Sequence, residues 1–315
     1  MERIVPAMTV EELNEIVRSD GFGEFIRVSE ARQVKALSRL ADGIVAREGT
    51  RLVLVSGASS AGKTTTAMRL ATQLRVEGCE AVNLSTDDYF VGDARNPRDE
   101  NGELDYETVE AVDRVRLARD LAGLLEGREV RLRKFDFARH EGRDAEKTTR
   151  LKKGAVVVLE GIHALNPLLT ENLHGVGAWR LFVEPKPALE LFEGLGLASS
   201  QARFFRRLVR DRSFRGLDPR ETFRLWPKVC EGERKWIRPF APSADAVFDS
   251  YLPYEAAVLK NYVYGLLTRL RLEEPSLPGL GAACEFFEAV AAAPDGCVPG
   301  DSILRETIGG SQLEY

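Results

Sequence analysis

The chain has 315 residues, 44% of them hydrophobic and 30% charged, with a formal net charge of −5. This balance is typical of a folded globular protein, and the small negative charge argues against a nucleic-acid binder, although local basic patches stay open. No apolar run is long enough to cross a bilayer, and no basic segment followed by an apolar one opens the chain. We therefore expect a cytoplasmic protein with no nucleic-acid or membrane partner.

The first fifty residues carry a helical pattern. Ser29 is suited to cap a helix, and apolar residues recur after it at helical spacing, at Val34, Leu37, Leu40, Ala41 and Ile44. We interpret residues 1–49 as a helical N-terminal extension that packs on the main domain.

Short apolar runs then alternate with helical stretches. The clearest runs lie at 52–55, 155–159 and 181–183, with a weaker candidate at 130–135, and the helices are expected at 63–74 and 108–125. Continuous apolar runs are typical of strands that are buried on both faces of a parallel sheet. The alternation predicts a three-layer α/β fold with a mostly parallel sheet.

The C-terminal third is mostly helical from residue 199 to about residue 272. A Pro/Gly-rich stretch at 274–281 then leads to a short apolar helix and a polar tail. We expect a main domain at 50–272, in which about 199–240 forms a helical lid, and a C-terminal extension at 273–315.

The cysteines and histidines show no metal-binding pattern. No C-x-x-C pair occurs, and the histidines hold no ligand spacing with the cysteines. We expect the cysteines to be buried, reduced thiols. The residues concerned are Cys79, Cys230, Cys284, Cys297, His140, His163 and His174.

Residues 57–64 read Gly-Ala-Ser-Ser-Ala-Gly-Lys-Thr and match the phosphate-binding pattern G-x-x-x-x-G-K-[ST] in full. The motif follows an apolar strand and opens a helix, so a chance Gly/Ser-rich turn is a poor alternative. The loop N–H groups and the helix N-terminus would face the phosphates of ATP. Lys63 would add positive charge at the β- and γ-phosphates, and Thr64 could bind Mg²⁺. The predicted ATP-binding residues of this segment are Gly57, Ala58, Ser59, Ser60, Ala61, Gly62, Lys63, Thr64 and Thr65.

The loop alone does not separate a kinase from a GTPase or a motor ATPase. The chain has neither the N-K-x-D pattern of guanine recognition nor the L-S-G-G-Q pattern of transporter ATPases. The apolar run at 155–159 ends in Glu160, a carboxylate placed to reach Mg²⁺ directly or through water. A satisfied acidic residue at a strand end is the alternative interpretation.

Residues 84–90 end a further strand with Leu-Ser-Thr-Asp-Asp-Tyr-Phe. Ligands of open α/β sheets bind beyond the carboxyl ends of the strands. Phosphoryl transfer to a hydroxyl needs a carboxylate there that orients the hydroxyl and accepts its proton. Asp87 and Asp88 would point in opposite directions in an extended chain, so only one can be this base, and the other would be solvated or cap a turn.

Together these motifs resemble the uridine kinase and phosphoribulokinase family of P-loop kinases. The resemblance spans roughly residues 50–265. It is carried in order by residues 57–64, 85–90, Phe135-Asp136-Phe137, 159–162, 206–211 and Arg215-Gly216. Residues 96–103 and 302–311 look closer still to a bacterial branch of uridine and nucleoside kinases. The resemblance implies ATP- and Mg²⁺-dependent phosphorylation of a small-molecule acceptor, and related kinases often form homo-oligomers.

The resemblance also implies a role for each matching residue. Asp87 matches the catalytic aspartate, and Thr64 and Glu160 match the Mg²⁺ site, to which we also assign Asp87. Asp105 matches a carboxylate that holds sugar hydroxyls, and Arg207 matches an arginine on the acceptor side.

A cluster of arginines is predicted to form a lid over the ATP phosphates. Arg203, Arg207 and Arg210 fall on one face of a helix, with Arg206 adjacent. Guanidinium groups suit a polyphosphate because they carry permanent charge and forked donors, although such a cluster can also be a solvated basic face. By resemblance, Arg210 and Arg215 match the lid arginines. The predicted catalytic residues are Asp87, Lys63 and Arg210.

The acceptor end departs from the uridine–cytidine kinases. Where those enzymes use polar side chains to bind the base, this chain has Phe90, Phe135, Leu217 and Leu225, whereas His140 matches a base-contacting histidine. Apolar residues cannot read polar edges by hydrogen bonds. A nucleoside is the leading acceptor, and another sugar, a sugar phosphate or a polyol is the alternative, followed by a non-catalytic ATP-binding protein. The predicted substrate-binding residues are Asp87, Phe90, Asp105, Phe135, His140 and Arg207.

The tail that contains Gly309, Gly310 and Ser311 either folds over the site or anchors the C-terminus. Anchoring is the favoured interpretation.

Overall fold

The computed structural model of the protein describes residues 8–136, 139–173, 175–192 and 195–314. Phe137 of the sequence motif and His174 lie outside the described residues, as do residues 1–7 and Tyr315. Within the described ranges, no helix is long and apolar enough to cross a membrane.

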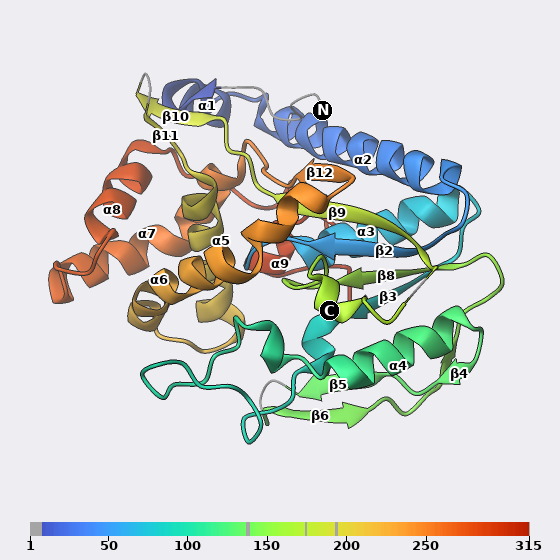
Figure 1. The fold of residues 1–315 in the computed structure, drawn as a ribbon. Coiled ribbons are helices and arrows are strands. Elements are labelled where there is room, and N and C mark those ends of the chain that lie inside the picture. The colour runs from blue at the N-terminus through green and yellow to red at the C-terminus, as the bar shows by residue number, and fades with distance from the viewer. Residues whose placement is uncertain (1–7, 137–138, 174, 193–194, 315) are drawn as a thin grey trace.

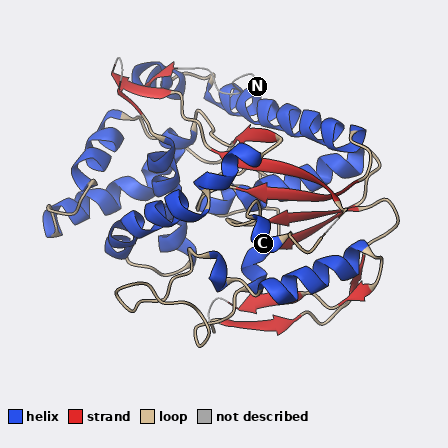
Figure 2. Cartoon of the chain, in the orientation of Figure 1, coloured by secondary structure: helices blue, strands red, loops and turns tan. Residues whose placement is uncertain are grey.

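The centre of the molecule is a five-stranded parallel sheet with the strand order β12-β9-β2-β8-β3 (Figures 1 and 2). Side chains alternate between the two faces, so that Leu52 and Leu54 join one buried cluster and Val53 and Val55 join another. The predicted mostly parallel sheet is therefore confirmed. The strands are β2 (Thr50–Ser56), β3 (Ala81–Ser85), β8 (Val156–Glu160), β9 (Gly177–Glu184) and β12 (Ala246–Asp249).

Helices cover both faces of this sheet and make the fold three-layered (Figure 1). On one face, α2 (Phe22–Ala46) and α3 (Lys63–Val76) pack against the strands through a shared apolar cluster. On the other face, α4 (Arg114–Leu125) contributes Leu117 and Leu121 to the second cluster. Residues before the main domain thus supply one of the helices that cover its sheet.

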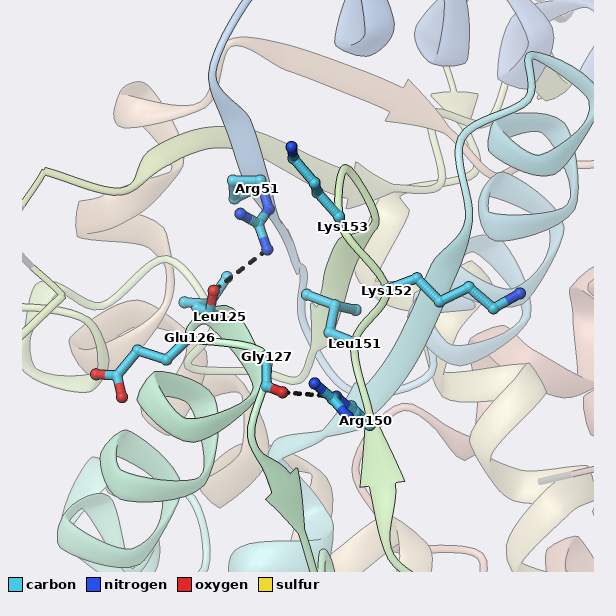
Figure 3. Close-up of a pocket in the computed structure, with 8 residues that line it drawn as sticks. All are labelled: Arg51, Leu125, Glu126, Gly127, Arg150, Leu151, Lys152 and Lys153. Atoms are coloured by element: carbon cyan, nitrogen blue, oxygen red, sulfur yellow. Dashed lines mark hydrogen bonds between the residues drawn. The ribbon is translucent and has the colours of Figure 1, made fainter.

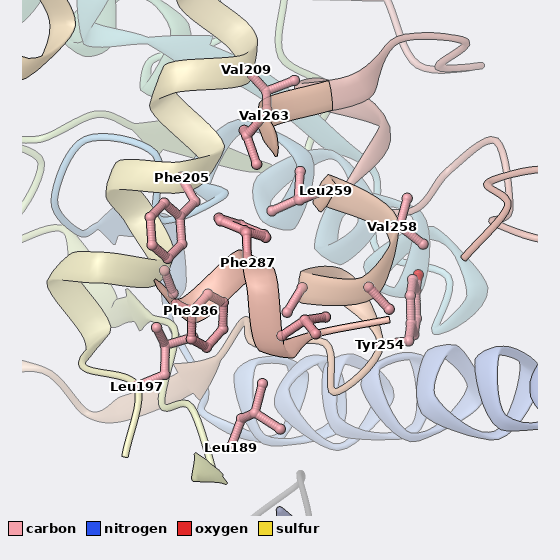
Figure 4. Close-up of a cluster of buried hydrophobic side chains, with 14 of the residues drawn as sticks. Leu189, Leu197, Phe205, Val209, Tyr254, Val258, Leu259, Val263, Phe286 and Phe287 are labelled. Carbon is pink, nitrogen blue, oxygen red and sulfur yellow. The ribbon is translucent and has the colours of Figure 1, made fainter. Parts of the chain in front are cut away.

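A helical lobe with its own apolar core lies beside the sheet (Figure 4). Phe205, Val258 and Phe287 pack together there, from three different helices. Burial of about 25 cal/mol per Å² of apolar surface makes such a core the main source of the lobe's stability. The helices are α1 (Val10–Arg18), α5 (Ser199–Phe214), α6 (Pro219–Trp236), α7 (Glu255–Glu273) and α8 (Leu280–Ala289), and the short α9 (Arg305–Ile308) follows in the tail.

Short strands and turns complete the chain. Parallel β1–β10 pairing and antiparallel β10–β11 pairing tie the N-terminus to the lobe, and two antiparallel pairs, β4–β7 and β5–β6, lie near α4. The strands are β1 (Met8–Thr9), β4 (Glu129–Val130), β5 (Arg133–Asp136), β6 (Glu141–Asp144), β7 (Thr149–Arg150), β10 (Leu189–Phe192) and β11 (Leu195–Gly196). The 3₁₀ turns are η1 (Thr86–Tyr89), η2 (Val109–Ala111), η3 (Pro167–Leu169) and η4 (Arg238–Ser243).

Several expected elements have different bounds. The run at 130–135 is divided between β4 and β5, neither of which joins the central sheet. The helix expected at 108–125 begins only at Arg114, because Asp113 caps it and η2 precedes it. Strand β12 was missed, since four apolar and acidic residues amid helices give no periodic signal.

The expectation for Ser29 was wrong, and the expected burial of the cysteines holds only for Cys284. Ser29 does not cap a helix, because it lies inside α2 and its hydroxyl donates to the carbonyl of Phe25 at 2.7 Å. The cysteines are free thiols, but only Cys284 is buried, and Cys297 is exposed on the surface. A cysteine at a surface position such as that of Cys297 can stay exposed, so residue type alone does not predict burial.

Candidate functional site

The phosphate loop runs from the end of β2 to the start of α3. A Cβ atom at position 57 would overlap the carbonyl oxygen of Val183, so the close approach to β9 requires glycine. Gly62 has φ of +85° and Ser60 has φ of +60°, both in the left-handed region. A non-glycine residue in this region is a strained feature that clusters at ligand sites. Lys63 donates from Nζ to the carbonyl of Ala58 at 3.2 Å, which keeps its charge over the loop.

Asp87 and Glu160 lie on neighbouring strand ends beside this loop. Strands β3 and β8 are in register at Ser85 and Glu160, and Asp87 follows in η1. Burial raises the pKa of Glu160 to about 7, with a further contribution from Asp87. Burial also raises the pKa of Asp87, against the lowering effect of Lys63 and Arg215. A cation beside these two carboxylates would offset the unfavourable effect of Asp87 on the ionisation of Glu160.

A divalent cation fits this donor set. Among the residues that the structure describes, no group of three or more histidine, cysteine, aspartate or glutamate side chains forms a metal site. The oxygens of Asp87, Glu160 and Thr64 could still hold Mg²⁺, because this ion commonly takes only one or two carboxylates and completes its shell with phosphate oxygens and water.

Asp88 faces away from this pair. Its carboxylate accepts from Lys134 Nζ at 2.9 Å and from the Phe135 amide at 3.3 Å. The two aspartates lie on a 3₁₀ turn rather than in the extended chain that we expected. Their side chains nevertheless have different neighbours. Asp88 fixes β5 against η1, and Asp87 is the aspartate beside Glu160.

Three of the predicted arginines converge on one buried carboxylate, Asp211. Arg207 Nε donates to it at 3.0 Å and Arg210 donates through two nitrogens at 3.2 and 2.9 Å. Arg215 lies 3.6 Å from the same group. Arg207 also donates to the Ser59 hydroxyl of the phosphate loop at 3.0 Å. Asp211 therefore holds the guanidinium groups beside the loop, a role that its place in the sequence does not reveal.

The other two arginines of the cluster are structural. Arg203 is buried in an ion pair with Glu233 at 2.5 Å and donates to the Ser59 carbonyl at 3.2 Å. Arg206 is buried in an ion pair with Glu255 at 2.6 Å. A lid over the ATP phosphates was expected for the whole cluster, with a solvated basic face as the alternative. Neither describes these two arginines, because helices α6 and α7 supply the carboxylates that pair with them in the interior.

The predicted acceptor residues Phe90 and Phe135 lie in a group of aromatic rings. Phe90 meets Phe135 edge to face at 5.6 Å between centroids, and Tyr106 at 5.3 Å. His140 Nδ1 lies 3.2 Å from the Tyr106 hydroxyl, and both contact the Asp93 carboxylate. Tyr106 and Asp93 could not be identified from the sequence, since their proximity depends on how the loop between η1 and η2 folds.

The expected acceptor residues do not all gather here. Phe90 and Phe135 share one apolar cluster, whereas Leu217 and Leu225 are only partly buried and belong to none of the buried clusters. Asp105 accepts from the Glu107 amide at 3.0 Å, which places Glu107 next to it. Glu107 was also missed, although its position two residues after Asp105 was a usable signal.

The C-terminal tail reaches the phosphate loop. Thr65, the buried residue after Thr64, donates to Glu306 at 2.8 Å. The Ile303 side chain lies against Gly62 so closely that a Cβ atom there would be 2.7 Å from its Cγ2. A small hollow between loop, helix and tail is lined by Ser60, Gly62, Arg206, Arg210, Ile303, Glu306 and Thr307.

A second hollow lies at the opposite end of the sheet, where β2 begins (Figure 3). Both arginines of its lining are engaged, since Arg51 donates to the carbonyls of Ala155 and Leu125 and Arg150 donates to that of Gly127. Lys152 pairs with Glu80 at 2.9 Å. This hollow shares no residue with the phosphate loop. The Asp87–Glu160 pair is therefore the better candidate site.

The chain is similar in sequence to known proteins. The model of the phosphoribulokinase/uridine kinase family matches residues 52–255. A uridine kinase of Deinococcus deserti is 32% identical over 59% of this chain and 76% of its own length. A uridine kinase of Staphylococcus aureus is 27% identical over 54% of this chain and 72% of its own length. A solved structure described as a possible uridine kinase of Bacillus stearothermophilus is 19% identical, with a TM-score of 0.45 over 70% of this chain and 100% of its own.

Proposed function

The chain belongs to the phosphoribulokinase/uridine kinase family, and we propose that it transfers the γ-phosphoryl group of ATP to a hydroxyl of a nucleoside. The observation that carries the proposal is the placement of Asp87 and Glu160 beside Lys63 and the phosphate loop. The relatives that are named uridine kinases support the nucleoside as acceptor.

In an in-line phosphoryl transfer, the residues of the site would have different roles. The loop amides, Lys63 and the lid arginines Arg210 and Arg215 bind and orient the triphosphate and offset charge that develops on it. Bound at Thr64, Asp87 and Glu160, Mg²⁺ would supply further charge neutralisation. Asp87 orients the acceptor hydroxyl and accepts its proton, for which a raised pKa is suitable. On the acceptor side, Asp105 and Arg207 would position the molecule.

A second acceptor class, a free sugar or polyol, is favoured by the group of aromatic rings. Phe90 and Phe135 offer apolar faces where recognition of a base would require hydrogen-bonding groups. The hydroxyl-binding carboxylate Asp105 would serve a nucleoside ribose and a free polyol equally well.

The test is Asp87→Asn, assayed for acceptor-dependent ADP release and separately for ATP binding. Loss of the base should reduce turnover by about 10²–10⁴-fold while ATP still binds. The matched control is Asp88→Asn, which alters the neighbouring aspartate that pairs with Lys134. Wild-type turnover by Asp87→Asn would refute the role of Asp87. Tight ATP binding by the wild type without turnover on any acceptor would instead indicate a regulatory ATP-binding protein.

A further inference from the structure

The C-terminal tail contacts the phosphate loop, although it lies outside the family domain that ends at residue 255. Thr65 Oγ1 donates to the Glu306 carboxylate at 2.8 Å, across a separation of 241 residues along the chain. Ile303 lies against Gly62. The short helix α9 thus lies beside the end of β2, where the loop begins (Figure 1).

Ile303 packs on the backbone of the loop. Its side chain is 1% exposed and belongs to the same apolar cluster as Ala61 of the loop and Ala67 of α3. A Cβ atom at Gly62 would lie 2.7 Å from Ile303 Cγ2, and Gly62 is the residue with φ of +85° that precedes α3. Because close-packed interiors deform little, Ile303 restrains the backbone at the point where the loop becomes a helix.

Glu306 restrains the first turn of α3. Thr65 is the third residue of this helix and is fully buried. The N–H groups of a first helical turn have no partner within the helix and face an anion that binds there. A hydrogen bond to a carboxylate is stronger than one between neutral groups. The bond from Thr65 to Glu306 therefore holds the turn whose amides face the ATP phosphates.

The tail is itself held in place, so it can support the loop. Leu304 is fully buried in the core of the helical lobe, whereas Ile303 belongs to the cluster between the sheet and its helices. Arg305 donates to the carbonyl of Asp295 at 2.9 Å and to that of Val298 at 2.7 Å. The tail therefore joins the two cores at the phosphate loop.

Little space remains between the tail and the loop. The hollow that they share with α5 has a volume of about 10 Å³, which is the space of about one water molecule. Neither a base nor a ribose fits into it. Ile303 and Glu306 therefore act on the loop and its helix, rather than on a ligand.

We propose that Ile303 and Glu306 of the tail are positioning residues that hold the phosphate loop in its ATP-binding conformation. This inference rests on the proposed kinase function and adds residues beyond the family domain to nucleotide binding. The two contacts reduce the conformational freedom that the loop loses when the triphosphate binds, and preorganisation of this kind increases affinity. The effect is the same for any ligand that carries the triphosphate.

The first test is Ile303→Ala, which removes the contact with Gly62. The matched control is Ile44→Ala, because Ile44 is also 1% exposed in the same cluster but lies at the end of α2, shortly before β2 begins. Calorimetric titrations with MgATP and with magnesium tripolyphosphate are made where circular dichroism shows each variant folded. We expect Ile303→Ala to bind both ligands about tenfold more weakly, and Ile303→Val and Ile44→Ala to stay within about twofold of the wild type.

The second test compares Glu306→Ala with Glu306→Gln. Glu306 is only partly buried, so both variants are expected to fold even if Ile303→Ala does not. Both lack the negative charge, but only the glutamine keeps an acceptor for the Thr65 hydroxyl. We expect Glu306→Ala to bind MgATP about fivefold more weakly than Glu306→Gln, because one hydrogen bond separates them.

The outcomes separate the positioning role from the function on which it rests. Wild-type affinity or tighter binding in folded Ile303→Ala, an equal loss in Ile44→Ala, or equal affinities of the two Glu306 variants would overturn the role and leave the kinase intact. A loss for MgATP alone, with tripolyphosphate unaffected, would overturn it too, because the tail would then act on the nucleoside part. Absence of MgATP binding by the wild type would overturn the proposed function itself.

Discussion

The buried carboxylate of Asp211 gives the sharpest prediction about how the arginines are held. It is fully buried and receives hydrogen bonds from Arg207 and Arg210, with Arg215 at 3.6 Å. Asp211→Asn keeps the shape of the side chain and removes its charge. The remaining amide oxygen can accept from one guanidinium group, and the amide nitrogen faces the others as a donor.

The expected loss of stability follows from these contacts. A hydrogen bond to a charged group is worth about 1.5–3 kcal/mol, and removal of one partner from a buried ion pair costs about 3–5 kcal/mol. The side chains of Arg207 and Arg210 are only 12% and 14% exposed, so water replaces the lost contacts incompletely. We expect Asp211→Asn to lower the free energy of unfolding by about 3 kcal/mol.

Urea denaturation and calorimetric titration with ATP measure the two consequences. The unfolding midpoint should fall, and ATP should bind about tenfold more weakly, because Arg210 and Arg215 lose their fixed orientation beside the phosphate loop. Asp42→Asn, at an exposed position near the C-terminal end of α2, is the control and should change stability by less than about 0.5 kcal/mol. Wild-type stability and ATP affinity in Asp211→Asn would refute the reasoning.

Two further predictions concern carboxylates near the nucleotide. Glu306→Gln retains an acceptor for Thr65 but removes a negative charge beside the phosphate loop, so calorimetry should show ATP binding about threefold more tightly, and weaker binding would contradict this. Glu160 and Glu107 each have a pKa raised to about 7, chiefly by burial, so the folded protein binds protons more tightly than the unfolded chain. The free energy of unfolding should therefore fall as pH rises from about 4.5 to about 7, and an undiminished slope in Glu160→Gln would contradict the assignment.

The sequence predicted those parts of the molecule that depend on short-range patterns. The phosphate loop has fixed spacing, and the strand at 52–55 shows its burial directly as a continuous apolar run. The order of motifs then placed Asp87 and Glu160 at the same sheet edge, since parallel strands end together. Their assigned roles stay predictions.

The sequence could not predict contacts between distant segments. Helical spacing put Arg203, Arg206, Arg207 and Arg210 in one cluster, but the partners that bury the first two, Glu233 and Glu255, come from later helices. The position of Glu107 depends on how its loop meets α6.

The central claim is phosphoryl transfer to a hydroxyl that Asp87 orients. It is tested most directly by mass spectrometry of reactions that contain ATP, Mg²⁺ and uncharged nucleosides or polyols, with ADP quantified in parallel. The account predicts that the wild type forms one O-phosphorylated acceptor for each ADP, and that Asp87→Asn forms about 10²-fold less although it binds ATP. ADP release without a phosphorylated acceptor, or an equal yield from Asp87→Asn, would contradict it.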